Sequence, residues 1–185
     1  EFDLLFKEML IGVTGFFRDP AVWQDLKDAL PALLRARGAE DRRLRAWVVG
    51  CSTGEEAYSL AMVFKEAADA LPAPDSYSLQ VFATDLSVDA IAFARKAHYP
   101  PRITEAVSPE RLARFFTAES DGFRVRTEIR EMVLFAQHDV IVDPPFTRLD
   151  VLCCRNLLIY FNAALQRRLV PLFHYSLRPG GILVL

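Results

Sequence analysis

The sequence has no excess of charge of either sign and no long hydrophobic run. Its 185 residues include 22 basic and 24 acidic ones, which gives a net charge of −2. Such a balance argues against a nucleic-acid binder that works by neutralising phosphates. No stretch approaches the roughly 18 consecutive apolar residues of a membrane helix, and the first ten residues lack the basic region of a signal peptide. We therefore expect a cytoplasmic protein with no membrane insertion and no nucleic-acid partner.

Cysteine is also scarce, with three residues in the chain. Cys51, Cys153 and Cys154 contain no C-x-x-C pair, so they indicate neither a disulfide framework nor a zinc site. Adjacent residues of a strand point to opposite faces, so a bond between Cys153 and Cys154 is not expected. The three histidines show no metal-ligand spacing either. The sequence predicts buried free thiols and no bound metal.

Short apolar segments alternate with segments of helical pattern along the chain. Strands are predicted over 44–51, 78–84, 133–136 and 149–153, with a last strand after a turn at 178–181. Helices are predicted over 20–37, 54–71, 87–97 and 163–177, with Pro31 kinking or dividing the first of them. The pattern weakens between 99 and 130, where it predicts a loop over 99–104 and a short helix over 108–116. The alternation predicts an α/β fold whose parallel sheet has helices on both faces.

Ligands of such sheets bind outside the carboxyl ends of the strands. The first strand ends in VVGCSTGEE (48–56), where one glycine permits a sharp turn and the second opens the next helix. The segment contains neither G-x-G-x-x-G nor G-K-[ST], so it does not support a dinucleotide or triphosphate site. Taken alone, this loop is more typical of turn chemistry than of a binding site.

Polar side chains at the other strand ends favour a binding site. Asp85, in ATDL, follows the second strand and can accept hydrogen bonds from a ribose diol, although an aspartate here can equally cap a helix. Asp139, in QHDV, can accept from an adenine amino group. Arg155 and Asn156 follow the strand LDVLC. Four strand ends with polar groups predict one adenosine-type ligand lying across the sheet.

Four motifs, in this order, resemble those of the CheR family of chemotaxis protein methyltransferases. They are VTGFFRD (13–19), GCSTGEEAYS (50–59), ATD (83–85) and CRNLLIYF (154–161). Two further segments, HDVIVDPPFTRLD (138–150) and QRRLVPLFHYSLRPGG (166–181), are especially similar to the methyltransferase module of CheB/CheR fusion proteins. The resemblance extends from about Leu10 to Leu185.

The resemblance implies a Rossmann-like class I methyltransferase fold that binds S-adenosylmethionine (SAM). The family transfers the methyl group of SAM to glutamate side chains of chemoreceptors, which forms glutamate methyl esters and leaves S-adenosylhomocysteine. Residues 1–40 would form an N-terminal helical segment with a motif that covers the cofactor, and residues 41–185 the SAM-binding domain. The last strands of the sheet, and the small β subdomain with which some members dock chemoreceptors, are expected beyond residue 185. The implied partner is the cytoplasmic helices of a chemoreceptor or another signalling protein.

The resemblance also assigns residues of this chain to each part of the cofactor. Thr14 and Arg18 would face the methionine end, with Arg18 pairing its carboxylate, and Glu55 would hold its amino group. The remaining assignments are Asp85 with the adjacent Leu86 for the ribose, Asp139 and Val140 for the adenine, Arg155 and Asn156 for the floor beside the sulfonium, the backbone of Gly50, Cys51 and Ser52 for close contacts, and Tyr160 for orienting the methyl donor or the acceptor.

Two departures from the family pattern leave alternatives open. Gly12 stands where the family often has asparagine, and Asp139 stands where asparagine is common at the adenine position. Asp139 can still accept from an amino group but cannot donate. A SAM-binding regulatory module without turnover is therefore a second hypothesis, and a methyltransferase that acts on another substrate is a third.

Overall fold

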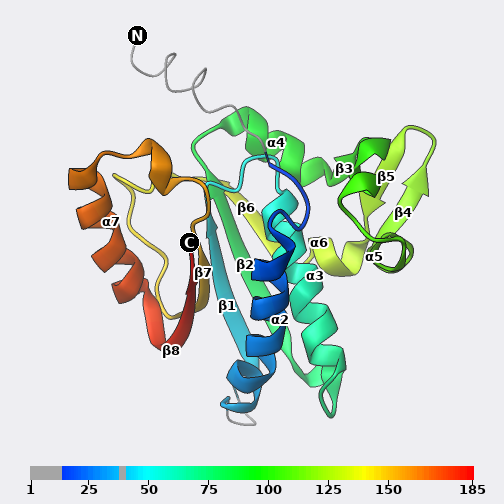
Figure 1. Ribbon diagram of the computed structural model, residues 1–185, viewed down its shortest axis with the longest axis horizontal. Helices are drawn as coiled ribbons and strands as arrows, with labels where there is room; N and C mark the ends of the chain where they lie inside the picture. Colours follow the sequence, from blue (N-terminus) through cyan, green and yellow to red (C-terminus); the bar gives the residue numbers. More distant parts are fainter. Residues whose placement is uncertain (1–13, 38–40) are drawn as a thin grey trace.

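A five-stranded parallel sheet forms the centre of the computed structural model, which describes residues 14–37 and 41–185 (Figure 1). The strand order is β6-β2-β1-β7-β8, and every neighbouring pair is parallel. The strands are β1 (Arg43–Val49), β2 (Ser78–Asp85), β6 (Val133–Gln137), β7 (Leu149–Cys153) and β8 (Leu177–Val184). The order runs outward from β1 on one side and from β7 on the other, so these two strands flank the switch point at which such sheets bind ligands.

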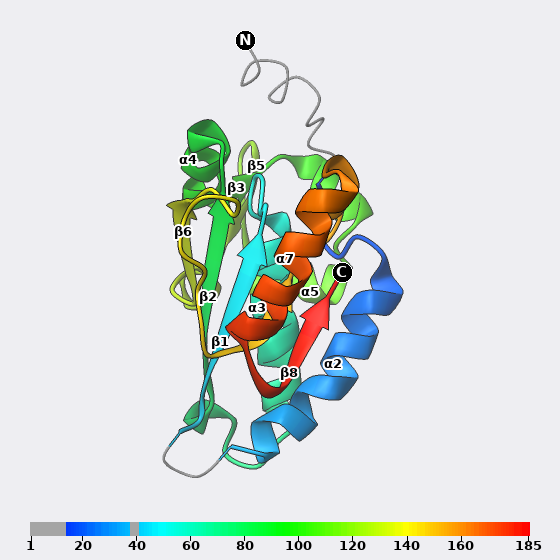
Figure 2. The same cartoon turned by 90° about the vertical axis from the view of Figure 1, so that its left-hand side faces the viewer.

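Helices cover both faces of this sheet (Figure 2). They are α2 (Pro20–Arg35), α3 (Glu55–Asp69) and α4 (Val88–Lys96) on one side and α7 (Ala163–Ser176) on the other. Side chains of β1 alternate between two separate cores, as the period of a strand requires. Ala46 and Val48 lie in the core shared with α2 and α3, whereas Trp47 and Val49 lie in the core shared with α7. The fold class predicted from the sequence is confirmed.

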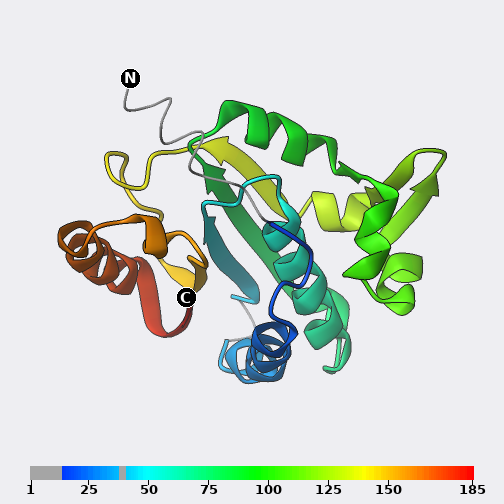
Figure 3. The same ribbon diagram turned by 45° about the horizontal axis from the view of Figure 1, so that its top comes forward.

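A small β unit projects from the sheet between α4 and β6 (Figures 1 and 3). It contains β3 (His98–Tyr99), η2 (Pro101–Glu105), α5 (Pro109–Phe115), β4 (Phe116–Glu119), β5 (Gly122–Val125) and α6 (Thr127–Arg130). The three strands are antiparallel in the order β3-β5-β4. A Cβ at Gly122 would lie 2.1 Å from the carbonyl oxygen of Tyr99, so glycine is needed for β5 to approach β3.

The sequence-based expectation for this unit was wrong in one respect. Residues 99–104 are not one loop, since they contain the end of β3 and most of η2. The pattern did not reveal the small β unit because β3 has two residues and is defined by its pairing with a distant strand.

Four strands of the central sheet agree with the prediction to within two residues, and β7 agrees at both ends. The predicted turn at 178–181 is wrong, because these residues lie within β8, where an irregularity interrupts the pairing with β7. Helix α2 runs through Pro31, so of the two predicted effects of this proline, a kink or a division, the division does not occur. Burial of Leu30 and Leu34 on either side of the proline keeps the helix packed despite the lost backbone hydrogen bond. The segment that connects α3 to β2 contains the short η1 helix (Pro74–Ser76).

The cysteine prediction is confirmed for all three residues. Each is free and buried. Cys153 belongs to the core beneath α3 and Cys154 to the core beneath α7, on opposite faces of the sheet. Within the described parts of the chain, no helix combines the length and apolar character required to cross a membrane. Gly12 lies outside the described residues.

Candidate functional site

The parallel strands bring five segments of the sequence to one edge of the sheet, where their carboxyl ends lie (Figure 3). Four of these segments follow strands and the fifth precedes α2. They are 14–19, 50–55 after β1, 85–87 after β2, 138–143 after β6 and 154–160 after β7. Every residue predicted to contact the cofactor lies in one of them. The topology therefore assembles the predicted site from residues far apart in sequence.

Asp85 joins the loops that follow β1 and β2. Its carboxylate accepts the backbone N–H of Ser52 at Oδ2 (2.8 Å) and that of Ser87 at Oδ1 (2.8 Å). A carboxylate offers about four lone-pair sites, so both oxygens retain the capacity to accept from a ribose diol. The residue that caps α4 is Ser87, whose hydroxyl accepts from the N–H of Ala90 (3.2 Å). The helix-cap alternative for Asp85 is thereby removed.

Strained backbone is concentrated at this edge. Among the described residues other than glycine, seven have a positive φ, and four of the seven lie in the site segments: Phe17, Asp19, Ser52 and Asn156. Such conformations cost about 1–3 kcal/mol each and persist where the surroundings enforce them, often at functional sites. The enrichment supports a ligand site at this edge independently of residue type.

Gly54 combines a positive φ with neighbouring atoms that leave no room for a side chain. Its φ is +95°, and a Cβ would lie 2.9 Å from Ala94 Cβ and 3.1 Å from Tyr99 Oη. We expect Gly54→Ala to lower the free energy of unfolding by more than Gly180→Ala. Gly180 has a φ of +80° but no described atom within 4 Å, so its substitution carries only the backbone cost of about 1–3 kcal/mol. Urea unfolding of both variants measures the difference, and equal losses would contradict the crowding at Gly54.

Glu55 is a partly buried carboxylate held by hydroxyl groups. The Thr53 hydroxyl donates to its Oε2 (2.7 Å), and the side chain of Thr14 also hydrogen-bonds to it. Burial raises the pKa of Glu55, and the hydrogen bond from Thr53 and the charge of Arg102 offset only part of this effect. An ammonium group placed beside the carboxylate would favour its ionised form. The environment thus fits the predicted contact with the amino group of methionine.

Arg155 lies almost completely buried after β7 and ties separate segments together. Its Nη2 lies 2.5 Å from Asp19 Oδ2 and its Nη1 lies 3.2 Å from Glu56 Oε2. The guanidinium also lies over the ring of Trp23, 5.6 Å from the ring centre. Its side chain is 4% exposed. These contacts hold segment 14–19 against the start of α3, so Arg155 positions the part of the chain that carries Thr14 and Arg18.

Glu56 should make the stability of the protein depend on pH. Burial raises its pKa from 4.5 to about 7, although the charge and hydrogen bond of Arg155 act in the opposite direction. Between these values the folded state keeps a proton that the unfolded state has released, so stability falls as pH rises from about 4.5 to about 7. The loss is on the order of 3 kcal/mol, since one pKa unit corresponds to about 1.4 kcal/mol. We expect Glu56→Gln to remove this fall, as measured by urea unfolding across that pH range. An identical pH slope in wild type and variant would contradict the assignment.

The adenine end of the predicted site is a turn closed by its own side chains. Asp139 Oδ1 accepts the N–H of Ile141 (2.8 Å), and the N–H of Asp139 donates to Asp143 Oδ2 (2.8 Å). Val140 packs against the core beneath α7. The turn is anchored to that core by the ring of His138, whose centre lies 5.4 Å from that of Trp47 in an edge-to-face arrangement. Hydrogen bonds and packing within the described chain therefore hold the turn against which an adenine would lie.

Some of the remaining predicted residues are exposed at this edge, and others were predicted to act through their backbone. Leu86 is 51% exposed, and Tyr160, in η3 (Leu158–Tyr160), is 40% exposed. Asn156 and Arg18 are also exposed. Gly50 turns with a φ of +67°, and the side chain of Leu157 lies 3.0 Å from the place of a Cβ there.

Three residues that the sequence analysis did not select take part in the site: Asp19, Glu56 and Trp23. In the quoted motifs, Asp19 follows Arg18 and Glu56 follows Glu55. The second acidic residue of STGEE was the sequence signal by which Glu56 could have been found. Trp23 has no such signal, because it belongs to the apolar stripe of a helix.

Comparison with known proteins points to one family. A family model described as CheR methyltransferase, SAM binding domain, matches residues 12–185. An uncharacterized 104.1 kDa protein in the hypE 3' region of Rhodobacter capsulatus is 42% identical over 179 residues, which cover 97% of this chain and 19% of that protein. Chemotaxis protein methyltransferase 1 of Pseudomonas aeruginosa is 34% identical over 187 residues, which cover 99% of this chain and 68% of that protein.

A likeness to a solved structure is also found. A SAM-dependent methyltransferase from Geobacter sulfurreducens, in complex with S-adenosyl-L-homocysteine, has a TM-score of 0.48 and 17% identity to this chain. The match covers 94% of this chain and 50% of that one.

Proposed function

This chain belongs to the CheR methyltransferase family, and we propose that it serves to transfer the methyl group of SAM to glutamate side chains of a chemoreceptor-type protein. SAM is the cofactor of the matched domain. The products would be S-adenosylhomocysteine and a glutamate methyl ester. The proposed acceptor is the cytoplasmic helices of a chemoreceptor or another signalling protein, and the proposed location is the cytoplasm.

The complementarity of one sheet edge to the four polar parts of SAM carries the proposal. Asp85 offers a carboxylate for the ribose diol and Glu55 a partly buried carboxylate for the ammonium group. Arg18 offers a guanidinium for the carboxylate, and Asp139 an acceptor for the adenine amino group. All four belong to segments that the sheet topology brings to the same edge.

The proposed chemistry requires alignment of the reactants and no strong base. SAM supplies a methyl group on a cationic sulfur, which leaves without protonation. The pKa of a free glutamate is about 4.3, so the acceptor is already ionised at pH 7. The task of the residues is to hold the acceptor oxygen in line with the methyl group and to exclude water. Tyr160, partly exposed after β7, is our candidate for orienting the acceptor.

Transfer of a labelled methyl group tests this function. We expect the full protein to incorporate label from SAM into receptor cytoplasmic helices, and mild alkali to release it, since glutamate methyl esters are base-labile. Label on serine, on a small molecule or on nucleic acid would contradict the proposed acceptor. SAM binding with no transfer to any acceptor would instead favour the regulatory module.

A further inference from the structure

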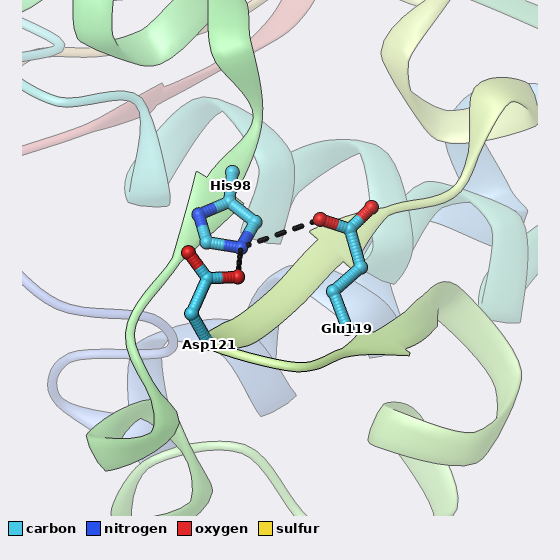
Figure 4. A group of neighbouring side chains, drawn as sticks. All are labelled: His98, Glu119 and Asp121. Atoms are coloured by element: carbon cyan, nitrogen blue, oxygen red, sulfur yellow. Dashed lines mark ion pairs between the residues drawn. The ribbon is translucent and has the colours of Figure 1, made fainter.

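Three side chains of the small β unit converge outside the cofactor edge (Figure 4). His98 lies on β3, Glu119 ends β4, and Asp121 lies in the turn between β4 and β5. Strand pairing brings them together, because β5 pairs with β3 through His98 and Arg124 and with β4 through Glu119 and Gly122. The sequence predicted no metal because these residues have no local ligand spacing.

The distances from His98 Nε2 to the two carboxylates are close to those between ligands of one metal ion. Nε2 of His98 lies 3.1 Å from Asp121 Oδ1 and 3.4 Å from Glu119 Oε2. Tetrahedral zinc holds nitrogen and oxygen ligands at about 2.0–2.2 Å, which places neighbouring ligand atoms roughly 3.3–3.5 Å apart. Both measured separations lie close to that value. The three ligand atoms all lie within 4.8 Å of one another.

The imidazole nitrogen faces both carboxylates. Nε2 of His98 lies within ion-pair distance of Asp121 Oδ1 and Glu119 Oε2, and the side chain is 22% exposed. Nε2 itself is shielded from solvent and makes no hydrogen bond of acceptable geometry within the described chain, whereas buried polar atoms normally have such a partner. Figure 4 shows Nε2 facing the space between the two carboxylates. A cation in that space would use the nitrogen and both oxygens together.

Arg124, which is not one of the three residues, holds the carboxylate of Glu119 in place. Its Nε and Nη2 contact Glu119 Oε1 (2.5 Å) and Oε2 (3.0 Å), while its Nη1 donates to the carbonyl of Lys96 (2.8 Å). Each oxygen retains a further lone pair for a metal. Outer contacts of this kind commonly fix the orientation of ligating carboxylates.

We propose that His98, Glu119 and Asp121 bind a divalent transition-metal ion of the zinc type, with water as the fourth ligand. One imidazole and two carboxylates suit such ions, whereas magnesium and calcium prefer oxygen ligands alone. The ion would join β3 to the turn of the β4–β5 hairpin and thus clamp the small β unit. The site is independent of the proposed methyl transfer, because none of its residues belongs to the cofactor edge.

Titration of the full chain with Zn²⁺ and with Co²⁺ tests the site. We expect one equivalent of Zn²⁺ to bind in calorimetry and one of Co²⁺ to give the visible absorption of a tetrahedral ion without thiolate bands. His98→Ala and Asp121→Asn should each weaken binding about 10-fold or more, since loss of an outer contact alone costs about 10- to 100-fold. His174→Ala is the matched control, because His174 is an exposed histidine on α7, and it should bind as wild type does.

The outcomes are decisive even if one variant fails to fold. Asp121 is 76% exposed in a turn, so Asp121→Asn preserves the packing and decides the question if His98→Ala is unstable. Absence of binding by wild type, or equal binding by wild type and Asp121→Asn, would overturn the proposal. A loss of affinity in His174→Ala alone would place the metal on α7 and overturn it as well.

Discussion

Asp85→Ala is expected to weaken SAM binding by about 5- to 150-fold, or about 1–3 kcal/mol, the range for hydrogen bonds to a charged group. The carboxylate accepts backbone N–H groups from Ser52 and Ser87, so it fixes both loops that would contact the ribose. Its removal takes away the acceptor for the diol and leaves two N–H groups without their partner. Isothermal calorimetry with SAM measures the effect, and unfolding of the free protein measures the loss of loop stability.

Asp89→Ala is the matched control for this prediction. Asp89 is an exposed aspartate in the first turn of α4, four positions further along the chain. We expect its substitution to leave the Kd for SAM unchanged. A Kd unchanged in Asp85→Ala, or lowered affinity of equal size in both variants, would mean that the ribose does not bind at Asp85.

Above pH 7, where Glu56 is ionised, Arg155→Met is expected to destabilise the protein by about 3–5 kcal/mol. Removal of one member of a buried ion pair leaves an uncompensated charge, and costs of this size are typical. Here the charge left behind is Glu56, whose side chain is 16% exposed. The pair with Asp19 contributes less, because that carboxylate is 60% exposed and screened by solvent. Affinity for SAM should also fall, since segment 14–19 loses its anchor.

A double variant separates the charge from the packing. Arg155→Met combined with Glu56→Gln buries no unpaired charge, so it should recover a large part of the stability lost in Arg155→Met. Arg168→Met, at an exposed position on α7, should change stability by no more than about 0.5 kcal/mol. Urea unfolding tests all three variants. No recovery in the double variant would show that Arg155 acts through packing against Trp23.

The sequence alone was sufficient to predict the sheet and the edge that carries the candidate site, because both follow from local patterns. A short apolar run and a glycine turn located β1 and its loop, and Ser87, whose hydroxyl caps α4, lies at the start of the helix predicted over 87–97. The small β unit and the His98 group were missed because they depend on pairing between distant strands. The partners of Arg155 were missed for the same reason, since Asp19 lies 136 residues away in the chain. Long-range charge pairing leaves no periodic signal in a sequence.

A crystal structure with S-adenosylhomocysteine tests the central claim most directly. The account predicts that the ligand lies across the carboxyl ends of β1 and β2, with both ribose hydroxyls on the Asp85 carboxylate, the amino group at Glu55 and the adenine against Asp139 and Val140. A ligand bound at another edge of the sheet, or bound here without contact to Asp85, would contradict it.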